Sequence, residues 1–117
     1  MRILLTCLFL FVTLTVADDT CTCGGEYQVI GPPFKVHGRL SMWNGNPSMR
    51  IWIIGTKRML GIREGTQLPE NLEKLLIGFD TEVYGDFTVC HLAPYAEGDM
   101  QIVCVQAASN LIVKKRR

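Results

Sequence analysis

The sequence predicts a mostly β domain, a small five-stranded barrel with one short helix between its third and fourth strands. Three observations predict it. Strand-type alternation recurs along the chain from residue 34 onward, turn residues interrupt it at short intervals, and a single segment has convincing helical spacing. An open antiparallel sheet or a small sandwich with one helix would give the same periodicities, and this is the alternative architecture.

The first three predicted strands follow one another closely. Residues 34–42 alternate apolar with polar side chains at the period of two typical of a half-buried strand. An Asn-Gly pair and a proline within 43–47 predict a chain reversal. Residues 48–54 are rich in β-branched and aromatic residues and predict the second strand, and residues 57–62 predict a short third one.

The helix and the last two strands occupy the second half of the chain. Residues 69–76 carry a proline suited to a first helical turn, early acidic residues and leucines at helical spacing, which predicts a helix of two or three turns. Residues 81–92 predict a long strand in which Val83, Gly85, Phe87 and Val89 face one way. The last strand is expected over 100–107, joined to the preceding one by a hairpin loop at 93–99.

Three strands, one helix and two strands form the element order of an OB-type barrel. Gly38 and Gly85 each interrupt a predicted strand near its middle, where small barrels need sharp bends and close backbone approach. The two glycines therefore favour the barrel over the alternative sheet.

Three segments also resemble small exported bacterial proteins of unknown function. They are Gly38 to Ser41, Arg50 to Gly61 and Tyr84 to Cys90. The resemblance spans most of the chain that follows the signal sequence. It implies an exported bacterial domain and no particular activity.

The expected domain organisation starts with a signal peptide. Residues 1–17 combine a basic residue near the start, an apolar run and a small-residue cleavage signal ending at Ala17, and the apolar run is too short to span a bilayer. We expect an irregular Cys/Gly-rich arm over 18–33, a single β domain over 34–113 and a solvated basic tail over 114–117. The mature protein is expected to be secreted or periplasmic, with no transmembrane span.

The charge balance argues against one class of partner. The chain has 12 Lys and Arg and 11 Asp and Glu residues, and removal of Arg2 with the signal peptide leaves 11 of each sign. A near-neutral domain lacks the dominant basic surface on which electrostatic binding of nucleic acid depends. Nucleic acid is therefore an unlikely partner.

Four cysteines remain after loss of the one in the signal peptide, and an even count in an exported chain predicts disulfides. A hairpin centred near residue 97 would place Cys90 opposite Cys104, which predicts a bridge between them. Cys21 and Cys23 could bridge each other, attach separately to Cys90 and Cys104, or stay reactive. One intervening residue and no following helix favour a structural role over a redox one, and the absence of a second spaced ligand pair argues against zinc.

No arrangement in the sequence predicts catalysis. The two histidines, His37 and His91, lie in strand patterns, and no activated nucleophile accompanies either of them. Arg39, Glu82 and Asp86 could gather on one barrel face, but charged residues that alternate along strands are expected on any solvated surface. We therefore predict no enzyme activity, no cofactor and no metal.

The strongest functional pattern interleaves aromatic and basic side chains over the first three strands. On an OB-type barrel this region is the usual ligand-binding face, although an amphipathic strand with packed tryptophans would look similar. The predicted function is an exported, non-enzymatic binding or interaction domain for an unknown ligand or protein of the cell envelope. The alternative is a secreted inhibitor or envelope accessory protein that acts through exposed loops such as 93–99. The residues of the predicted ligand face are His37, Arg39, Trp43, Arg50, Trp52, Lys57 and Arg58.

Overall fold

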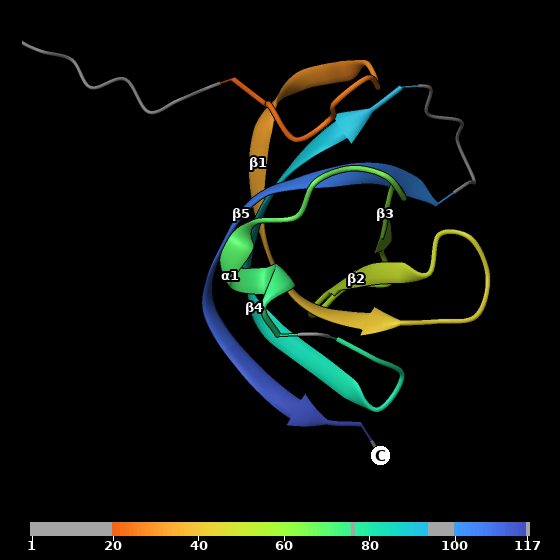
Figure 1. Cartoon of the computed structure of the whole chain (residues 1–117), viewed down its shortest axis with the longest axis vertical. Coiled ribbons are helices and arrows are strands. Elements are labelled where there is room, and N and C mark those ends of the chain that lie inside the picture. The colour runs from red at the N-terminus through yellow and green to blue at the C-terminus, as the bar shows by residue number, and fades with distance from the viewer. Residues whose placement is uncertain (1–19, 76, 94–99, 117) are drawn as a thin grey trace, which may run out of the picture.

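The computed structural model describes residues 20–116 apart from residue 76 and residues 94–99, and it forms a closed five-stranded barrel (Figure 1). The strands neighbour one another around the barrel in the order β1-β2-β3-β5-β4. One short helix lies between β3 and β4, as predicted, and closure of the barrel rules out the open sheet and the sandwich. The elements are β1 (Val29–Met42), β2 (Met49–Ile53), β3 (Met59–Ile62), α1 (Glu70–Glu73), β4 (Thr81–Leu92) and β5 (Gln101–Lys115).

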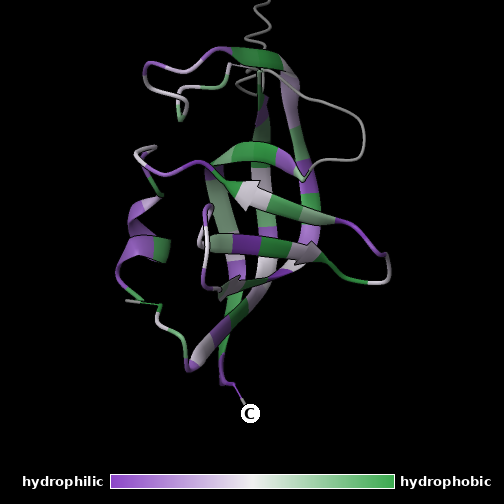
Figure 2. Ribbon diagram, turned by 90° about the vertical axis from the view of Figure 1, so that its right-hand side faces the viewer, coloured by the Kyte–Doolittle hydropathy of each residue, from purple (hydrophilic) through white to green (hydrophobic). Residues whose placement is uncertain are grey.

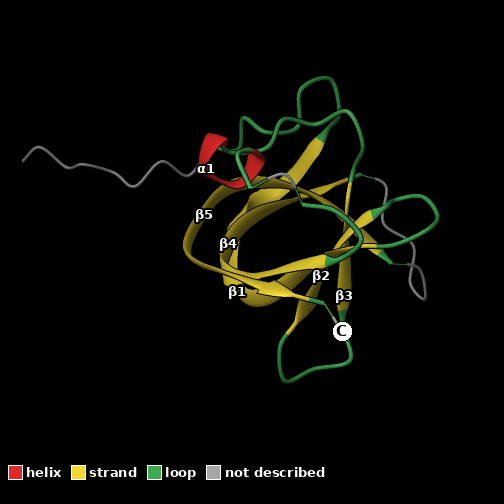
Figure 3. Ribbon diagram, turned by 60° about the horizontal axis from the view of Figure 1, so that its bottom comes forward, coloured by secondary structure: helices red, strands yellow, loops and turns green. Residues whose placement is uncertain are grey.

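Three long strands, β1, β4 and β5, make most of the barrel wall. β1 pairs along most of its length with β4, and its second half also pairs with β2. β3 and β5 pair in parallel, which closes the ring, whereas all other neighbours are antiparallel. Figure 3 shows the strands curling into this ring, with α1 at its rim.

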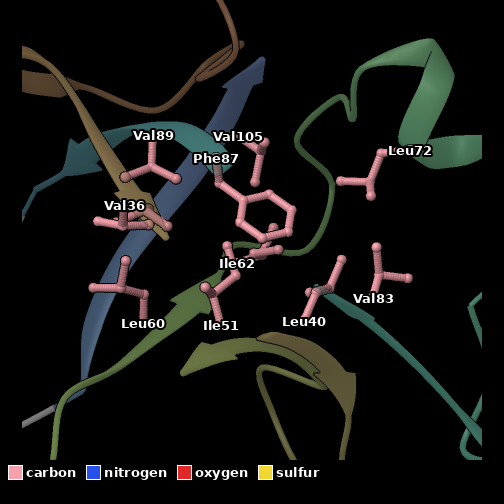
Figure 4. Close-up of a cluster of buried hydrophobic side chains, with 11 residues drawn as sticks. Val36, Leu40, Ile51, Leu60, Ile62, Leu72, Val83, Phe87, Val89 and Val105 are labelled. Atoms are coloured by element: carbon pink, nitrogen blue, oxygen red, sulfur yellow. The ribbon is translucent and has the colours of Figure 1, made fainter. Parts of the chain in front are cut away.

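The core fills the inside of the barrel because alternate residues of each strand point inward. Figure 2 shows the resulting alternation of hydrophobic and hydrophilic residues along the strands. Leu40 lies opposite Ile51 on one side and Val83 on the other, and all three are fully buried. Phe87 is the largest fully buried side chain, and α1 contributes the buried Leu72 (Figure 4).

Gly38 and Gly85 lie directly opposite each other on β1 and β4. A Cβ atom on Gly38 would lie 2.5 Å from Ile51 Cγ2, and one on Gly85 would lie 2.6 Å from Leu111 Cδ2. Neighbouring elements therefore approach the backbone where only glycine leaves room, as the mid-strand positions predict.

The first strand begins earlier than expected. β1 starts at Val29, so the prediction of an irregular arm over 18–33 is wrong for its last five residues. The pairing register with β4 shifts between Ile30 and Phe34, and Gly31 within this irregularity has a φ of 79°. A bulge tolerates the two prolines at 32–33, because its residues leave the regular ladder of hydrogen bonds.

The last strand ends later than expected, at Lys115 instead of residue 107. Lys114 and Lys115 therefore belong to a strand, and the prediction of a basic tail over 114–117 is wrong for them. Lys114 lies opposite Glu82 of β4, so opposite charges support the extension. An irregularity at Asn110, which has a φ of 54°, bends β5 partway along.

Three other elements are shorter than predicted. β2 runs from Met49 to Ile53 and lacks one residue at each end of the predicted range 48–54. β3 starts at Met59, which leaves Lys57 and Arg58 in the connection from β2. α1 has four residues instead of two or three turns. Pro69 at its N-cap provides no side-chain hydrogen bond, and no basic residue occupies its last turn. The helix therefore lacks an N-cap hydrogen bond at its start and a favourable positive charge at its end.

The predicted signal peptide over 1–17 and most of the predicted loop over 93–99 lie outside the described residues. Among the residues that are described, no helix has the length and apolar character needed to cross a membrane.

Candidate functional site

Two disulfides attach the segment before β1 to the hairpin of β4 and β5. Cys21 bonds to Cys90 and Cys23 to Cys104, with Cα separations of 6.2 Å and 5.7 Å. Cys90 does lie opposite Cys104 in the register, but the predicted bridge between them is wrong. Cys21 therefore reaches β4 and Cys23 reaches β5. Separate attachment, one of the pairings left open by the sequence, is the one observed.

Hydrogen bonds reinforce this attachment of the arm, which we define as residues 20–28. The Gln106 side chain accepts hydrogen bonds from the backbone N–H of Thr22 at 2.9 Å and of Cys23 at 3.0 Å. Its amide also donates to the Thr22 hydroxyl at 3.0 Å. At the far end of the arm, Ala93 N–H donates to the carbonyl of Gln28. The arm is therefore held to the barrel at both ends.

The cysteines do not form a metal site in this state. Within the described part of the chain, Cys23, Cys90 and Cys104 are the one group of potential ligands whose donor atoms all lie within 4.8 Å of one another. All three sulfurs are in disulfides, and a metal-binding cysteine must be a thiolate.

A second cluster lies on the outside of the barrel, where cations stack on aromatic rings. Arg39 of β1 lies 4.8 Å from the ring centre of Trp52, its cross-strand partner on β2. Lys114 of β5 lies 5.2 Å from the ring of Tyr84 on β4. Such contacts attract electrostatically and hold a cation in place.

Trp43, just after β1, has two cations over its ring. Arg50 lies 5.7 Å and Arg116 4.9 Å from the ring centre. Arg116 also donates hydrogen bonds to the carbonyls of Met42 at 2.7 Å and Phe79 at 3.2 Å, so the end of the chain is tied to the end of β1.

Glu82 is the acidic centre of this cluster. Its Oε2 lies 3.6 Å from Arg39 Nε and 3.5 Å from Arg116 Nε, and it accepts a hydrogen bond from the Ser41 hydroxyl. One carboxylate thus faces two guanidinium groups. We call the cluster the basic face, formed by Arg39, Trp43, Arg50, Trp52, Glu82, Tyr84, Lys114, Lys115 and Arg116.

A hollow of about 490 Å³ opens on the basic face between β1, β4 and β5. The hollow is lined by Arg39, Glu82, Tyr84, Lys114, Lys115 and Arg116. No family model, curated protein or solved structure matches this chain.

The predicted ligand face is divided by the structure. Its Arg39 and Trp52 are in contact, as are its Trp43 and Arg50. His37 also points outward from β1 but pairs with Asp86. The remaining two, Lys57 and Arg58, lie exposed in the connection between β2 and β3.

Sequence reasoning missed the contribution of β4 and β5 to this face. From the sequence alone we expect Lys114 and Arg116 in a solvated tail, Glu82 as an ordinary charge on a solvated strand and no part in a site for Tyr84. The sequence does contain a signal for this contribution. If the hairpin of the last two strands is extended beyond residue 107, its basic residues come to lie beside Glu82.

His37 and Asp86 form a polar pair on the outside of the barrel. His37 Nδ1 lies 2.9 Å from Asp86 Oδ1, and the Asn110 amide donates to Asp86 Oδ2 at 2.8 Å. The hydrogen bond from Asn110, followed by that from His37, lowers the pKa of Asp86. Among the described residues, Asp86 is the hydrogen-bond partner of the His37 ring, and no hydroxyl or thiol group hydrogen-bonds to it.

His91 has a different environment, because it is half-buried and stacks on Phe34 with ring centres 4.2 Å apart. Its buried Nδ1 has no hydrogen-bond partner among the described residues. Burial lowers the pKa of His91, and the positive charge of Arg58 lowers it further. Folding therefore favours the neutral ring.

This environment predicts how stability depends on pH. The unfolded chain binds a proton at His91 near pH 6.5 and the folded chain only at lower pH, so His91 contributes a loss of stability as pH falls below about 6.5. His91→Phe should keep the stack and reduce this loss, measured by urea unfolding at pH 7.5 and 5.5. His37→Gln is the control and should retain the loss. A His91→Phe variant with the full wild-type loss would contradict the prediction.

Proposed function

We propose that this chain is an exported, non-enzymatic binding domain that holds an anionic ligand on its basic face. The observation that carries the proposal is the hollow of about 490 Å³, whose lining has four cations and one carboxylate. That lining favours a ligand with negative groups, because it leaves an excess of positive charge at one surface.

The rings of the face support cations instead of offering free stacking surfaces. Arg39 covers Trp52, whose indole N–H also donates to the carbonyl of Thr56 at 2.7 Å. Trp43 has a guanidinium group over it from each of two arginines. A ligand would therefore meet charged groups that are already held in position, which reduces the entropy lost on binding.

The distribution of charge supports the same ligand class. The basic face contains five of the 12 basic residues of the chain and one of its 11 acidic residues, Glu82. The chain as a whole is close to neutral, so the rest of its surface is net acidic and would repel the same ligand. The position of the basic residues on the surface, more than the net charge of the chain, would then decide binding.

Cations on three strands suit an extended anion better than a single small one. Neighbouring strands lie about 4.8 Å apart, and residues two apart along a strand about 6.8 Å, so the positive groups are spaced over a broad surface. An acidic polymer of the cell envelope or the extracellular space, with repeated carboxylate, sulfate or phosphate groups, would fit this spacing.

The test removes the two lysines that line the hollow without an ion pair among the described residues. We expect the double variant Lys114→Gln/Lys115→Gln to bind a heparin-derived octasaccharide about 10- to 30-fold more weakly at about 0.1 M salt. The reason is that each cation near an anionic surface contributes about 1 kcal/mol. Isothermal titration calorimetry measures the affinity, and thermal unfolding verifies that the variant is folded.

The matched control is Lys57→Gln/Arg58→Gln, which removes the same charge from the exposed β2–β3 connection. It should bind the octasaccharide within about threefold of the wild type. Equal losses in both variants would mean that net charge alone drives binding, and undetectable wild-type binding would reject this ligand class.

The proposal also includes export of the chain and the similarity of its barrel to the OB fold. The two disulfides are consistent with an oxidising compartment outside the cytoplasm. The helix between β3 and β4 and the parallel contact of β3 with β5 support an OB-like barrel. We propose that residues 1–17 direct the chain to the periplasm or the extracellular space.

A second candidate function, a secreted inhibitor, is favoured by the arm. Thr22 and residues 25–28 are exposed while disulfides at Cys21 and Cys23 fix the adjoining backbone. An exposed segment held rigidly can enter a partner with little loss of conformational freedom. Thr22→Arg would impair such an inhibitor and leave octasaccharide binding unchanged, which separates the two functions.

A further inference from the structure

Three of the four disulfide sulfurs form one compact group. The Sγ atoms of Cys23, Cys90 and Cys104 all lie within 4.8 Å of one another, although Cys90 is bonded to neither of the other two. Cys21 is the partly exposed member of the four, whereas Cys90 and Cys104 are fully buried. The sulfur of the partly exposed residue is therefore bonded directly to one that lies beside the second disulfide.

We infer that the four cysteines form an exchange relay, in which a thiol that attacks Cys21 causes the arm to be released and a Cys90–Cys104 bridge to form. The substrate class is a small thiol or an exposed cysteine of another protein. This activity uses residues outside the basic face, so it does not depend on ligand binding there.

The relay consists of two substitutions at sulfur. The thiolate of the external thiol bonds to Cys21 Sγ, and the Cys21–Cys90 bond breaks to leave Cys90 as a thiolate. Cys90 then bonds to Cys104 Sγ, and the Cys23–Cys104 bond breaks, so Cys23 leaves as a thiolate that takes up the proton lost by the external thiol. The product retains two disulfides and has gained one whole thiol molecule, with no net oxidation or reduction.

The register makes the new bridge feasible. Cys90 and Cys104 are direct cross-strand partners, and such partners lie at a Cα separation that a disulfide can span. Exchange frees the arm from its covalent attachment and leaves noncovalent contacts, among them the hydrogen bonds to Gln106 and the stacking of Arg63 on the ring of Tyr27. The conformational freedom regained by the arm favours the product.

The decisive variant is Cys21→Ser, which leaves Cys90 as a free thiol beside the intact Cys23–Cys104 bond. The protein is held without reductant, trapped with N-ethylmaleimide at acid pH and digested with trypsin. The relay predicts that the arm peptide ending at Lys35 separates from the peptide of residues 75–114 in more than half of the molecules, with the maleimide on Cys23. An arm peptide that stays joined through Cys23–Cys104, with Cys90 alkylated, would overturn the relay.

Cys90→Ala is the matched control, because it leaves Cys21 as the free thiol and Cys21 is not a member of the compact sulfur group. The Cys23–Cys104 bond should survive, and the arm peptide should stay joined. Release of the arm in this variant as well would show unspecific exchange and would also contradict the relay.

A wild-type experiment covers the case in which the variant does not fold. Treatment with glutathione should give a species heavier by one glutathione, carried on Cys21, with the maleimide on Cys23 alone. Trapping of Cys90 or Cys104 by maleimide would indicate simple reduction and would refute the transfer between the two disulfides.

Discussion

Replacing both Cys21 and Cys90 by alanine is expected to lower the free energy of unfolding by about 3 kcal/mol. The Cys23–Cys104 bond stays in place in this variant, so the Cys21–Cys90 bridge closes a loop of about 16 residues that runs from Cys21 to Cys23 and from Cys104 to Cys90, which corresponds to about 3 kcal/mol in the chain-entropy model. Alanine is preferred to serine because Cys90 is fully buried and a hydroxyl there would lack a partner. Guanidinium unfolding under non-reducing conditions measures the change.

The companion variant, Cys23→Ala/Cys104→Ala, keeps the Cys21–Cys90 bond, opens the same short loop and should cost a similar amount. Each bridge alone keeps the arm on the barrel, so the losses are not expected to add when both are removed. A loss below about 1 kcal/mol in either variant would mean that the arm contributes little to the stability of the barrel.

Phe87→Ala is expected to destabilise the protein by about 3 to 5 kcal/mol, the usual range for truncating a buried aromatic side chain. Phe87 has no exposed surface and lies within the cluster of buried side chains shown in Figure 4. In the sheet it is paired with Val36 of β1 and Ala108 of β5. Every sheet neighbour of β4 would lose contacts with it. Thermal unfolding followed by circular dichroism measures the effect.

Phe79→Ala is the control for this variant, because Phe79 is 58% exposed and precedes β4 outside the barrel. Its removal should change stability by no more than about 0.5 kcal/mol. If the two substitutions had equal effects, the core assignment of Phe87 would be wrong.

The barrel could be predicted because its determinants are local in the sequence. Alternation from 34 to 42 specifies which side of β1 is buried, and Gly38 and Gly85 indicate where the backbones must approach closely. The positions of the two glycines opposite each other could not be read from either strand alone, because the register depends on both strands.

The disulfide pairing could be predicted only in part. The hairpin places Cys90 opposite Cys104, and that geometry by itself favours a bond between them. The observed pairing depends on the path of the arm, which brings Cys21 to β4 and Cys23 to β5. No local pattern in a Gly-rich segment encodes such a path.

The basic face was partly anticipated through Arg39, Trp43, Arg50 and Trp52, which neighbouring strands bring together. Its other half was missed because the residues from Ala107 to Asn110 look like the end of a strand. Pairing with β4 carries β5 through this stretch, since tertiary contacts override weak local preference.

The parallel contact between β3 and β5 has a consequence for how the chain is made. Leu60 pairs with Gln101 and Val29 with Leu92, so most of the sheet joins residues far apart in the sequence. Such topologies fold slowly, in roughly milliseconds to seconds, compared with proteins built from local contacts. During synthesis, one edge of β1 and one edge of β3 remain unpaired until β4 and β5 have emerged. In that interval the unpaired edges can associate with other chains.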